Sequence, residues 1–160
     1  MKTKAVRLYG TNDLRLEEFD LPPIGKDEIL ARVVCDSICM SSHKAAAQGT
    51  EHKRVPENIA QEPIIIGHEF AGEIVEVGEK WKEQFRPGDK FSIQPAMNYE
   101  HGPVGILSAP GYSYRYIGGD ATYVVIPNEV MECGCLLRYT GAGFYPASLA
   151  EPLSCVIGAM

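Results

Sequence analysis

The chain has 160 residues, a formal net charge of −6 and 45% hydrophobic residues, a composition typical of one ordinary globular domain. The acidic balance argues against nucleic acid or an anionic membrane surface as a partner. The apolar runs fall far short of the roughly 20 residues that a membrane-spanning helix needs, and no signal peptide is recognisable. Five cysteines without framework spacing favour a reducing, cytoplasmic setting.

Alternation of apolar and polar residues predicts strands in the first part of the chain. Residues 4–9 and 14–19 alternate around a short polar turn, which predicts a hairpin. A third strand is expected over residues 28–34. The alanine-rich segment 41–48 predicts a short helix that ends at Gly49.

The middle of the chain predicts one long β segment and two shorter strands. After a polar loop over 50–63, residues 64–77 are rich in β-branched residues, with breaks expected at Gly67 and Gly72. The remaining expectations are strands at 91–93 and 121–126, separated by a loop over 94–119.

The last fifteen residues differ in character from the rest. Ser148 and Glu151 have the spacing of a capping box, with Ser148 as N-cap. The apolar residues that follow predict a helix with no stop signal before Met160. We therefore expect one domain over residues 1–145, and the start of a helix that links it to a further domain over residues 146–160.

Three side chains of metal-binding type mark the chemistry of the chain: Cys39, His68 and Glu151. A thiolate, an imidazole and a carboxylate are all ligands of Zn²⁺, and three protein ligands with an open position are typical of a catalytic zinc site. On residue types alone other interpretations stay open. Cys39 could be a buried structural thiol, or a nucleophile with His68 as its base. Glu151 could be merely a carboxylate that caps a helix.

Five sequence blocks resemble the zinc-dependent medium-chain alcohol and polyol dehydrogenases. These are residues 38–41, 67–72 with 75–78, 87–89, Gly119 with 121–124, and 151–154. They span nearly the whole chain in the family's order, and the sequence is most similar to sugar-phosphate reductases of the L-sorbose-1-phosphate type. The resemblance implies a mainly β fold with short helices, a GroES-like partly open β-barrel. The Rossmann cofactor domain of the family is expected to lie outside this chain.

The resemblance also implies a role for individual residues. Cys39 and His68 stand where the family has its first two zinc ligands, and Glu151 stands at the third. Glu69 is then either an alternative ligand or a carboxylate beside the metal. Ser41 occupies the place of the hydroxyl that hydrogen-bonds the substrate oxygen and passes its proton outward. The catalytic candidates are Ser41, Glu69 and Lys44.

Several positions depart from the family pattern. Met40 replaces a small residue or Arg, and Ser42 replaces the usual Asp. Lys44 stands where a His often ends the proton relay, with His43 one place early. Because residues 94–119 contain no cysteine, we expect no second, structural zinc site.

The predicted function is the zinc-binding catalytic domain of an NAD(P)-linked oxidoreductase. It would interconvert a secondary alcohol and a ketone of a polyol or sugar phosphate. The resemblance implies Zn²⁺ and either NAD or NADP, the latter bound mainly by a domain absent from this chain. We expect the isolated chain to be inactive and the full-length protein to be a homo-oligomer. The alternatives are a non-enzymatic GroES-like partner-binding module and the zinc-free quinone reductase branch.

Other polar residues receive weaker interpretations. Four basic residues are candidates to hold a substrate phosphate, with solvated surface charge as the simpler interpretation: Lys44, Lys53, Arg54 and Arg115. We expect Cys133 and Cys135 in a loop and Cys155 in the core. His52 and His101 are given no role.

Overall fold

The structure is a computed structural model that describes residues 1–160. Its strands are β1 (Lys2–Gly10), β2 (Asp13–Asp20), β3 (Ile29–Asp36), β4 (Ile64–Ile65), β5 (Phe70–Val77), β6 (Lys90–Ile93), β7 (Tyr123–Ile126) and β8 (Leu136–Tyr139). Its α-helices are α1 (Met40–Gln48), α2 (Asn128–Glu132), α3 (Tyr145–Ser148) and α4 (Ala150–Gly158). Three short 3-10 helices lie at Gly49–Glu51, Glu79–Trp81 and Gly105–Leu107.

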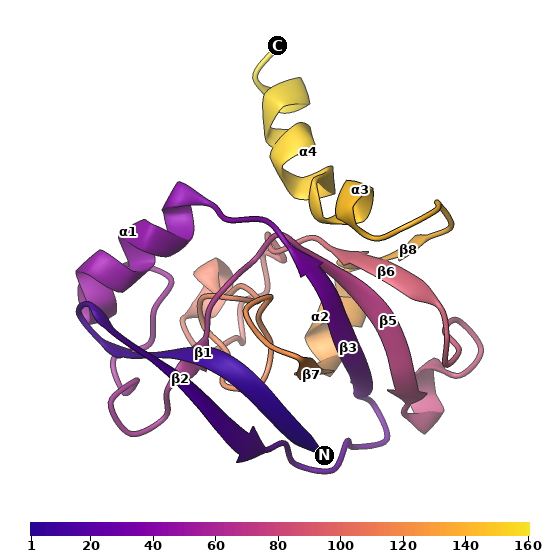
Figure 1. Ribbon diagram of the computed structural model, residues 1–160, viewed down its shortest axis with the longest axis horizontal. Coiled ribbons are helices and arrows are strands. Elements are labelled where there is room, and N and C mark those ends of the chain that lie inside the picture. Colours follow the sequence, from indigo (N-terminus) through magenta and orange to yellow (C-terminus); the bar gives the residue numbers. More distant parts are fainter.

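The strands form two antiparallel sheets with short helices around them (Figure 1). One sheet has the order β2-β1-β4 and the other has the order β7-β3-β5-β6-β8. A bridge between Ala5 and Ala121 links β1 to the residues before β7. The mainly β fold is confirmed. Because the edge strands of each sheet do not pair with each other, the sheets are not closed into a barrel. None of the helices has the length and apolar character that a membrane crossing requires.

The first hundred residues fold largely as their sequence pattern predicts. β1 and β2 form the expected hairpin, with Lys2 opposite Asp20 at its open end. α1 ends at Gln48, and Gly49 caps it with a φ of 56°, a conformation that glycine adopts without a side-chain penalty. Thus both the hairpin and the first helix are confirmed.

Two hydrophobic cores hold the sheets and α1 in place. The larger core lies on the five-stranded sheet and includes Phe70 of β5 and Phe91 of β6, both fully buried. The smaller core packs Ala45 of α1 against Leu8 of β1, and it also contains Tyr112 from the long loop before β7. Burying large apolar side chains of this kind stabilises the fold by about 1.5–3 kcal/mol each.

The two glycines of the long β segment behave differently. Gly67 has a φ of 91° and lies in the break between β4 and β5, as predicted. Gly72 stays inside β5, so the strand is not interrupted there. The predicted irregularity appears instead in the pairing with β3, where the register shifts between Val33, opposite Gly72, and Cys35. A Cβ on Gly72 would lie 2.0 Å from the carbonyl oxygen of Arg32. Its missing side chain therefore permits close approach of β3.

The predicted capping box at the C-terminal helix is wrong. Ser148 ends α3 and is buried, and its hydroxyl donates to the carbonyl oxygen of Tyr145 at 2.9 Å. It also lies 3.3 Å from both Cys35 Sγ and Ser37 Oγ. The Ser148 hydroxyl thus contacts residues at the end of β3 and does not cap α4. α4 begins without a side-chain cap. α4 projects away from the sheets, and none of its residues is buried (Figure 1).

Candidate metal centre

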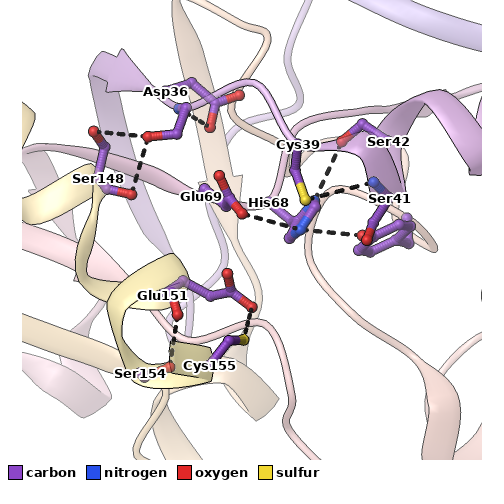
Figure 2. A network of polar contacts seen from close by, with 12 residues as sticks. Asp36, Cys39, Ser41, Ser42, His68, Glu69, Ser148, Glu151, Ser154 and Cys155 are labelled. Carbon is purple, nitrogen blue, oxygen red and sulfur yellow. Dashed lines mark hydrogen bonds and ion pairs between the residues drawn. The ribbon is translucent and has the colours of Figure 1, made fainter. Parts of the chain in front are cut away.

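Cys39, His68 and Glu69 converge at one end of β3 and β5. Their sulfur, nitrogen and oxygen ligand atoms all lie within 4.8 Å of one another, and His68 Nε2 is 3.8 Å from Glu69 Oε1. Both His68 and Glu69 are buried, whereas Cys39 is half-buried. Figure 2 shows the three side chains directed toward a common point. The structure thus brings together three of the four predicted metal-binding residues.

The pairing of β3 with β5 explains why these residues meet. Asp36 at the end of β3 lies opposite Phe70 at the start of β5. The backbone N–H of Ser37 then donates to the carbonyl of Glu69 at 3.1 Å. The segment that leaves β3 and the segment that enters β5 are therefore held side by side, one carrying Cys39 and the other carrying His68.

The sulfur of Cys39 occupies the N-cap position of α1. It accepts a hydrogen bond from the backbone N–H of Ser41 at 3.4 Å. The sulfur therefore lies beside the N-terminal N–H groups of the helix. The thiolate is the form of cysteine that binds a metal.

Two hydroxyl groups hold the imidazole of His68. Ser42 Oγ lies 3.2 Å from Nδ1, and the Tyr112 hydroxyl lies 3.1 Å from Nε2. With its hydrogen on Nδ1 and donated to Ser42, the ring presents a lone pair on Nε2, and a metal-ligating histidine is normally oriented in this way. From the sequence alone, Ser42 is only a departure from the family pattern, and Tyr112 has no predicted role. The spacing of Ser42 three residues after Cys39 on one helix was the available signal, whereas Tyr112 had none.

Burial and neighbouring charges keep the site receptive to a cation. Burial lowers the pKa of His68, the Glu151 carboxylate opposes that shift, and Arg54 adds to it. The neutral imidazole that a metal requires is therefore favoured. Burial also raises the pKa of Glu69, a hydrogen bond with Cys39 opposes the rise, and Glu151 adds to it. A cation among these groups would offset the cost of their negative charges.

The donor set fits Zn²⁺. In tetrahedral zinc sites with bonds of about 2.0–2.3 Å, ligand atoms are roughly 3.3–3.8 Å apart. The His68–Glu69 separation of 3.8 Å already lies at the edge of that range. The 4.8 Å limit for the whole set leaves only a small side-chain adjustment. One sulfur, one nitrogen and one oxygen leave a fourth position open.

Glu151 lies outside this closest set, but it shares a pocket with it. A pocket of about 190 Å³ is lined by residues that include Ser41, Arg54, His68, Tyr112 and Glu151. In Figure 2 Glu151 lies on α4 and faces the side of the site where Glu69 stands. Ser41 and His68 line this pocket together with Glu151.

The other candidate residues lie farther from the site. Lys44 is exposed on α1 and does not line the pocket. The expectation that Cys155 packs in the core is wrong: it is exposed, and its thiol donates to Glu151 Oε1 at 3.6 Å. No other element covers that face of α4. Cys133 and Cys135 belong to a turn between α2 and β8, as predicted, although α2 and β8 themselves were missed.

The histidines without an expected role differ from each other. His101 is exposed and touches only the edge of Tyr99. His52 is buried and stacks on Tyr112, with ring centroids 5.8 Å apart. His52 therefore supports the residue that contacts His68, a role that its polar sequence surroundings did not predict.

Comparison with known families gives the class of the chain. Residues 25–133 match the model of the alcohol dehydrogenase GroES-like domain, which covers the larger part of the chain. The chain belongs to this family. The expected resemblance to zinc-dependent alcohol and polyol dehydrogenases is thereby confirmed.

Individual relatives refine this class. The chain is 57% identical over 157 residues to the L-sorbose 1-phosphate reductase of Klebsiella pneumoniae, an alignment that covers 98% of the chain and 37% of that protein. It is 50% identical over 158 residues to the mannitol-1-phosphate 5-dehydrogenase of Aliivibrio fischeri, covering 99% of the chain and 36% of that protein. The chain thus spans little more than a third of the curated relatives that it matches.

The solved structures show the same fold. A protein from Sinorhizobium meliloti 1021, described as a zinc-binding dehydrogenase and solved with NADP, superposes with a TM-score of 0.74 at 23% identity. The alignment covers 98% of this chain and 44% of that one. This similarity establishes the GroES-like fold predicted from the sequence.

Proposed function

We propose that this chain is the zinc-binding catalytic part of an NAD(P)-linked oxidoreductase that interconverts a secondary alcohol and a ketone of a polyol or sugar phosphate. The convergence of Cys39, His68 and Glu69 carries this proposal. The names of the relatives, a sugar-phosphate reductase and a sugar-alcohol-phosphate dehydrogenase, support the substrate class.

We assign the metal to Cys39, His68 and Glu69, with Glu151 beside the open position. This assignment departs from the sequence-based preference for Glu151 as the third ligand, because Glu151 is not among the side chains whose ligand atoms lie within 4.8 Å. A bound Zn²⁺ would supply Lewis acidity to the reacting oxygen. Glu151 lines the pocket, where its carboxyl group would form a hydrogen bond with a substrate hydroxyl.

The chain's own residues account for orientation and proton transfer. Ser41 lines the pocket, and its hydroxyl both accepts and donates hydrogen bonds. It is the group that we assign to pass the proton of the substrate oxygen toward solvent. Lys44 is exposed on α1, the helix that also carries Ser41. We predict that it is the last group of this proton relay. Pro95, Ala96 and Ala109 supply the apolar wall of the pocket that limits water.

Nicotinamide would bind mainly to a part of the protein that this chain does not include. We therefore expect the isolated chain to take up zinc and to show no turnover with NADH or NADPH and ketoses. The five cysteines are all free, which suits the cytoplasmic setting that we propose. We also propose that the full-length protein is a homo-oligomer.

Metal analysis of the purified chain tests this function. We expect about one zinc per chain, and loss of it in Cys39→Ser and in His68→Ala. Cys133→Ser is the matched control, because Cys133 is exposed in a distant turn, and it should retain zinc. Wild-type zinc content in Cys39→Ser would contradict the metal site, and a wild-type chain without zinc would favour the non-enzymatic module.

A further inference from the structure

We propose that Arg54 recognises the phosphate group of the substrate, so that the pocket beside the metal centre selects phosphorylated over unphosphorylated polyols. This inference rests on the proposed function and names the residue that would determine its substrate class. Of the four basic residues singled out from the sequence, Arg54 alone lines the pocket that also contains Ser41, His68 and Glu151.

The other three basic residues lie in different surroundings. Arg115 is held in an ion pair with Glu62 at 2.7 Å. Lys53 is exposed and lines a neighbouring pocket, and Lys44 is exposed on α1. Their positive charge is solvated or already paired, which leaves Arg54 as the only arginine or lysine of the metal pocket.

Arg54 is the one arginine that is at least partly buried and has no carboxylate partner. Five of the seven arginines form ion pairs: Arg7, Arg15, Arg32, Arg115 and Arg138. The remaining one, Arg86, is exposed. A half-buried guanidinium without a counter-ion carries a desolvation cost that an anionic ligand would offset.

The guanidinium of Arg54 is held in place before any ligand binds. Its Nη1 donates to the carbonyl oxygen of Leu107 at 2.7 Å. Its backbone carbonyl accepts from Ser113 Oγ at 2.7 Å, and its backbone N–H donates to His52 Nδ1 at 3.3 Å. Because these contacts fix the residue from both sides, little conformational entropy is lost when an anion binds.

Most donors of this guanidinium remain available. Arg54 Nε and Nη2 form no hydrogen bond within the chain, and neither is among the buried polar atoms that lack a partner. They therefore reach solvent from the pocket wall. A guanidinium with two free nitrogens in one plane matches a phosphate through two parallel hydrogen bonds.

The position of Arg54 relative to the metal site suits a short phosphorylated polyol. Its guanidinium carbon is 5.9 Å from the centre of the Tyr112 ring, and the hydroxyl of that tyrosine is 3.1 Å from His68 Nε2. Arg54 and the metal site therefore lie about one tyrosine side chain apart. A polyol chain with a phosphate at one end would span that gap and place an inner hydroxyl at the metal.

The test measures binding of two probes to the zinc-loaded chain. Sorbitol 6-phosphate and sorbitol are titrated and followed by NMR shifts of backbone amides, which detect weak binding. We expect wild type to bind the phosphorylated probe at least about tenfold more tightly. Arg54→Met should remove that difference, with unchanged zinc content and unchanged affinity for sorbitol. Arg115→Met is the matched control and should keep the preference.

The outcomes separate this inference from the proposed function. Equal binding of the two probes by wild type, or an undiminished preference in Arg54→Met, overturns the role of Arg54 while zinc binding stands. A chain without zinc instead contradicts the proposed function itself. If Arg54→Met does not fold, Arg54→Lys serves, because lysine keeps the charge without the paired donors. We expect it to lose about three- to tenfold of the preference, and an unchanged preference overturns the inference.

Discussion

His68 shows how single residues decide what the site can bind. Its ring is buried between the Ser42 and Tyr112 hydroxyls, and burial lowers its pKa. The neutral form of the side chain is therefore favoured, and the two hydroxyls fix its orientation. Free imidazole in water has neither property at mildly acidic pH. The positions of the neighbours thus matter as much as the identity of the ligand.

At the residue scale, Gly67 should be indispensable to this geometry. Its φ is 91°, and a Cβ there would lie 2.3 Å from Asp36 Oδ2 and 2.7 Å from the backbone nitrogen of Asp120. Gly67→Ala should therefore lower the free energy of unfolding by about 3 kcal/mol and weaken zinc binding, because His68 follows directly. Chemical denaturation and zinc titration measure both effects.

Gly88→Ala provides the matched control for that substitution. Gly88 has nearly the same φ, 89°, but a Cβ there meets nothing within 4 Å. Gly88→Ala should lower the free energy of unfolding by only about 1–2 kcal/mol, the cost of the backbone conformation. It should still bind zinc. Equal losses in the two variants would show that contact with Asp36 is unimportant.

Asp36 should give the chain a pH-dependent stability. Burial raises the pKa of this carboxyl to about 7, and the nearby Asp120 carboxyl adds to the rise. Between the unfolded value of about 4 and about 7, the folded state binds more protons than the unfolded state. The free energy of unfolding should then fall as the pH rises through this window, by up to about 4 kcal/mol.

Replacement of Asp36 by its neutral isostere tests that expectation. Asp36→Asn cannot ionise, so at pH 8 it should be more stable than wild type, whereas at pH 4 the difference should nearly vanish. Urea unfolding of the metal-free proteins at both pH values is the measurement. A constant difference between the two proteins from pH 4 to pH 8 would rule out titration of Asp36 as the cause.

At the scale of elements, α3 and α4 are attached to the sheets in different ways. α3 is fixed by buried hydrogen bonds: Ser92 Oγ of β6 donates to the carbonyl of Ala147 at 2.7 Å, and Ser37 Oγ donates to that of Ser148 at 3.2 Å. α4 buries no residue of its own. It carries Glu151 to the edge of the metal site and adds little to the stability of the fold.

Removal of α4 should therefore leave the fold and the metal in place. A chain that ends at Leu149 should unfold within about 3 °C of the full chain, since the loss of about 1 kcal/mol shifts the midpoint of a domain this size by roughly that amount. It should still bind about one zinc, because Glu69 remains. Differential scanning calorimetry and metal analysis give both readouts. Loss of zinc on truncation would identify Glu151 as the third ligand.

Local patterns predicted the elements whose causes are local. The alternation of β1 and β2 and the alanines of α1 before Gly49 specify their structure within a few residues. By contrast, the use of Ser148 depends on Cys35 and Ser37, more than a hundred positions away. No local pattern could predict that the Ser148 hydroxyl would contact Cys35 and Ser37 and leave α4 without a cap.

The same distinction applies to the site. Cys39 and His68 were predictable because each stands in a recognisable sequence block. That Glu69 lies closer than Glu151 to Cys39 and His68 was not predictable, since it depends on the pairing of β3 with β5 and on the direction in which α4 leaves the sheets. Tyr112 and Arg54 lie in long irregular segments whose sequences show no helix or strand periodicity. Only the fold shows that both line the pocket that contains His68.

At the scale of the whole molecule, the chain is a GroES-like domain that spans little more than a third of its curated relatives. Its two open sheets provide a rigid support on which the loops before α1 and β5 meet. Cys39, His68 and Glu69, to which we assign the metal, all lie in this domain. It should accordingly bind zinc by itself, even though hydride transfer needs a nicotinamide that we assign to the remainder of the protein.

X-ray absorption at the zinc edge of the purified, zinc-loaded chain tests the metal site most directly. We predict one sulfur scatterer at about 2.3 Å and two or three nitrogen or oxygen scatterers at about 2.0–2.2 Å. Cys39→Ser should lose most of its zinc, and any zinc that it retains should show no sulfur scatterer. A spectrum of the wild-type chain without sulfur, or the same sulfur contribution in Cys39→Ser, would contradict the convergence of Cys39, His68 and Glu69 on a single ion.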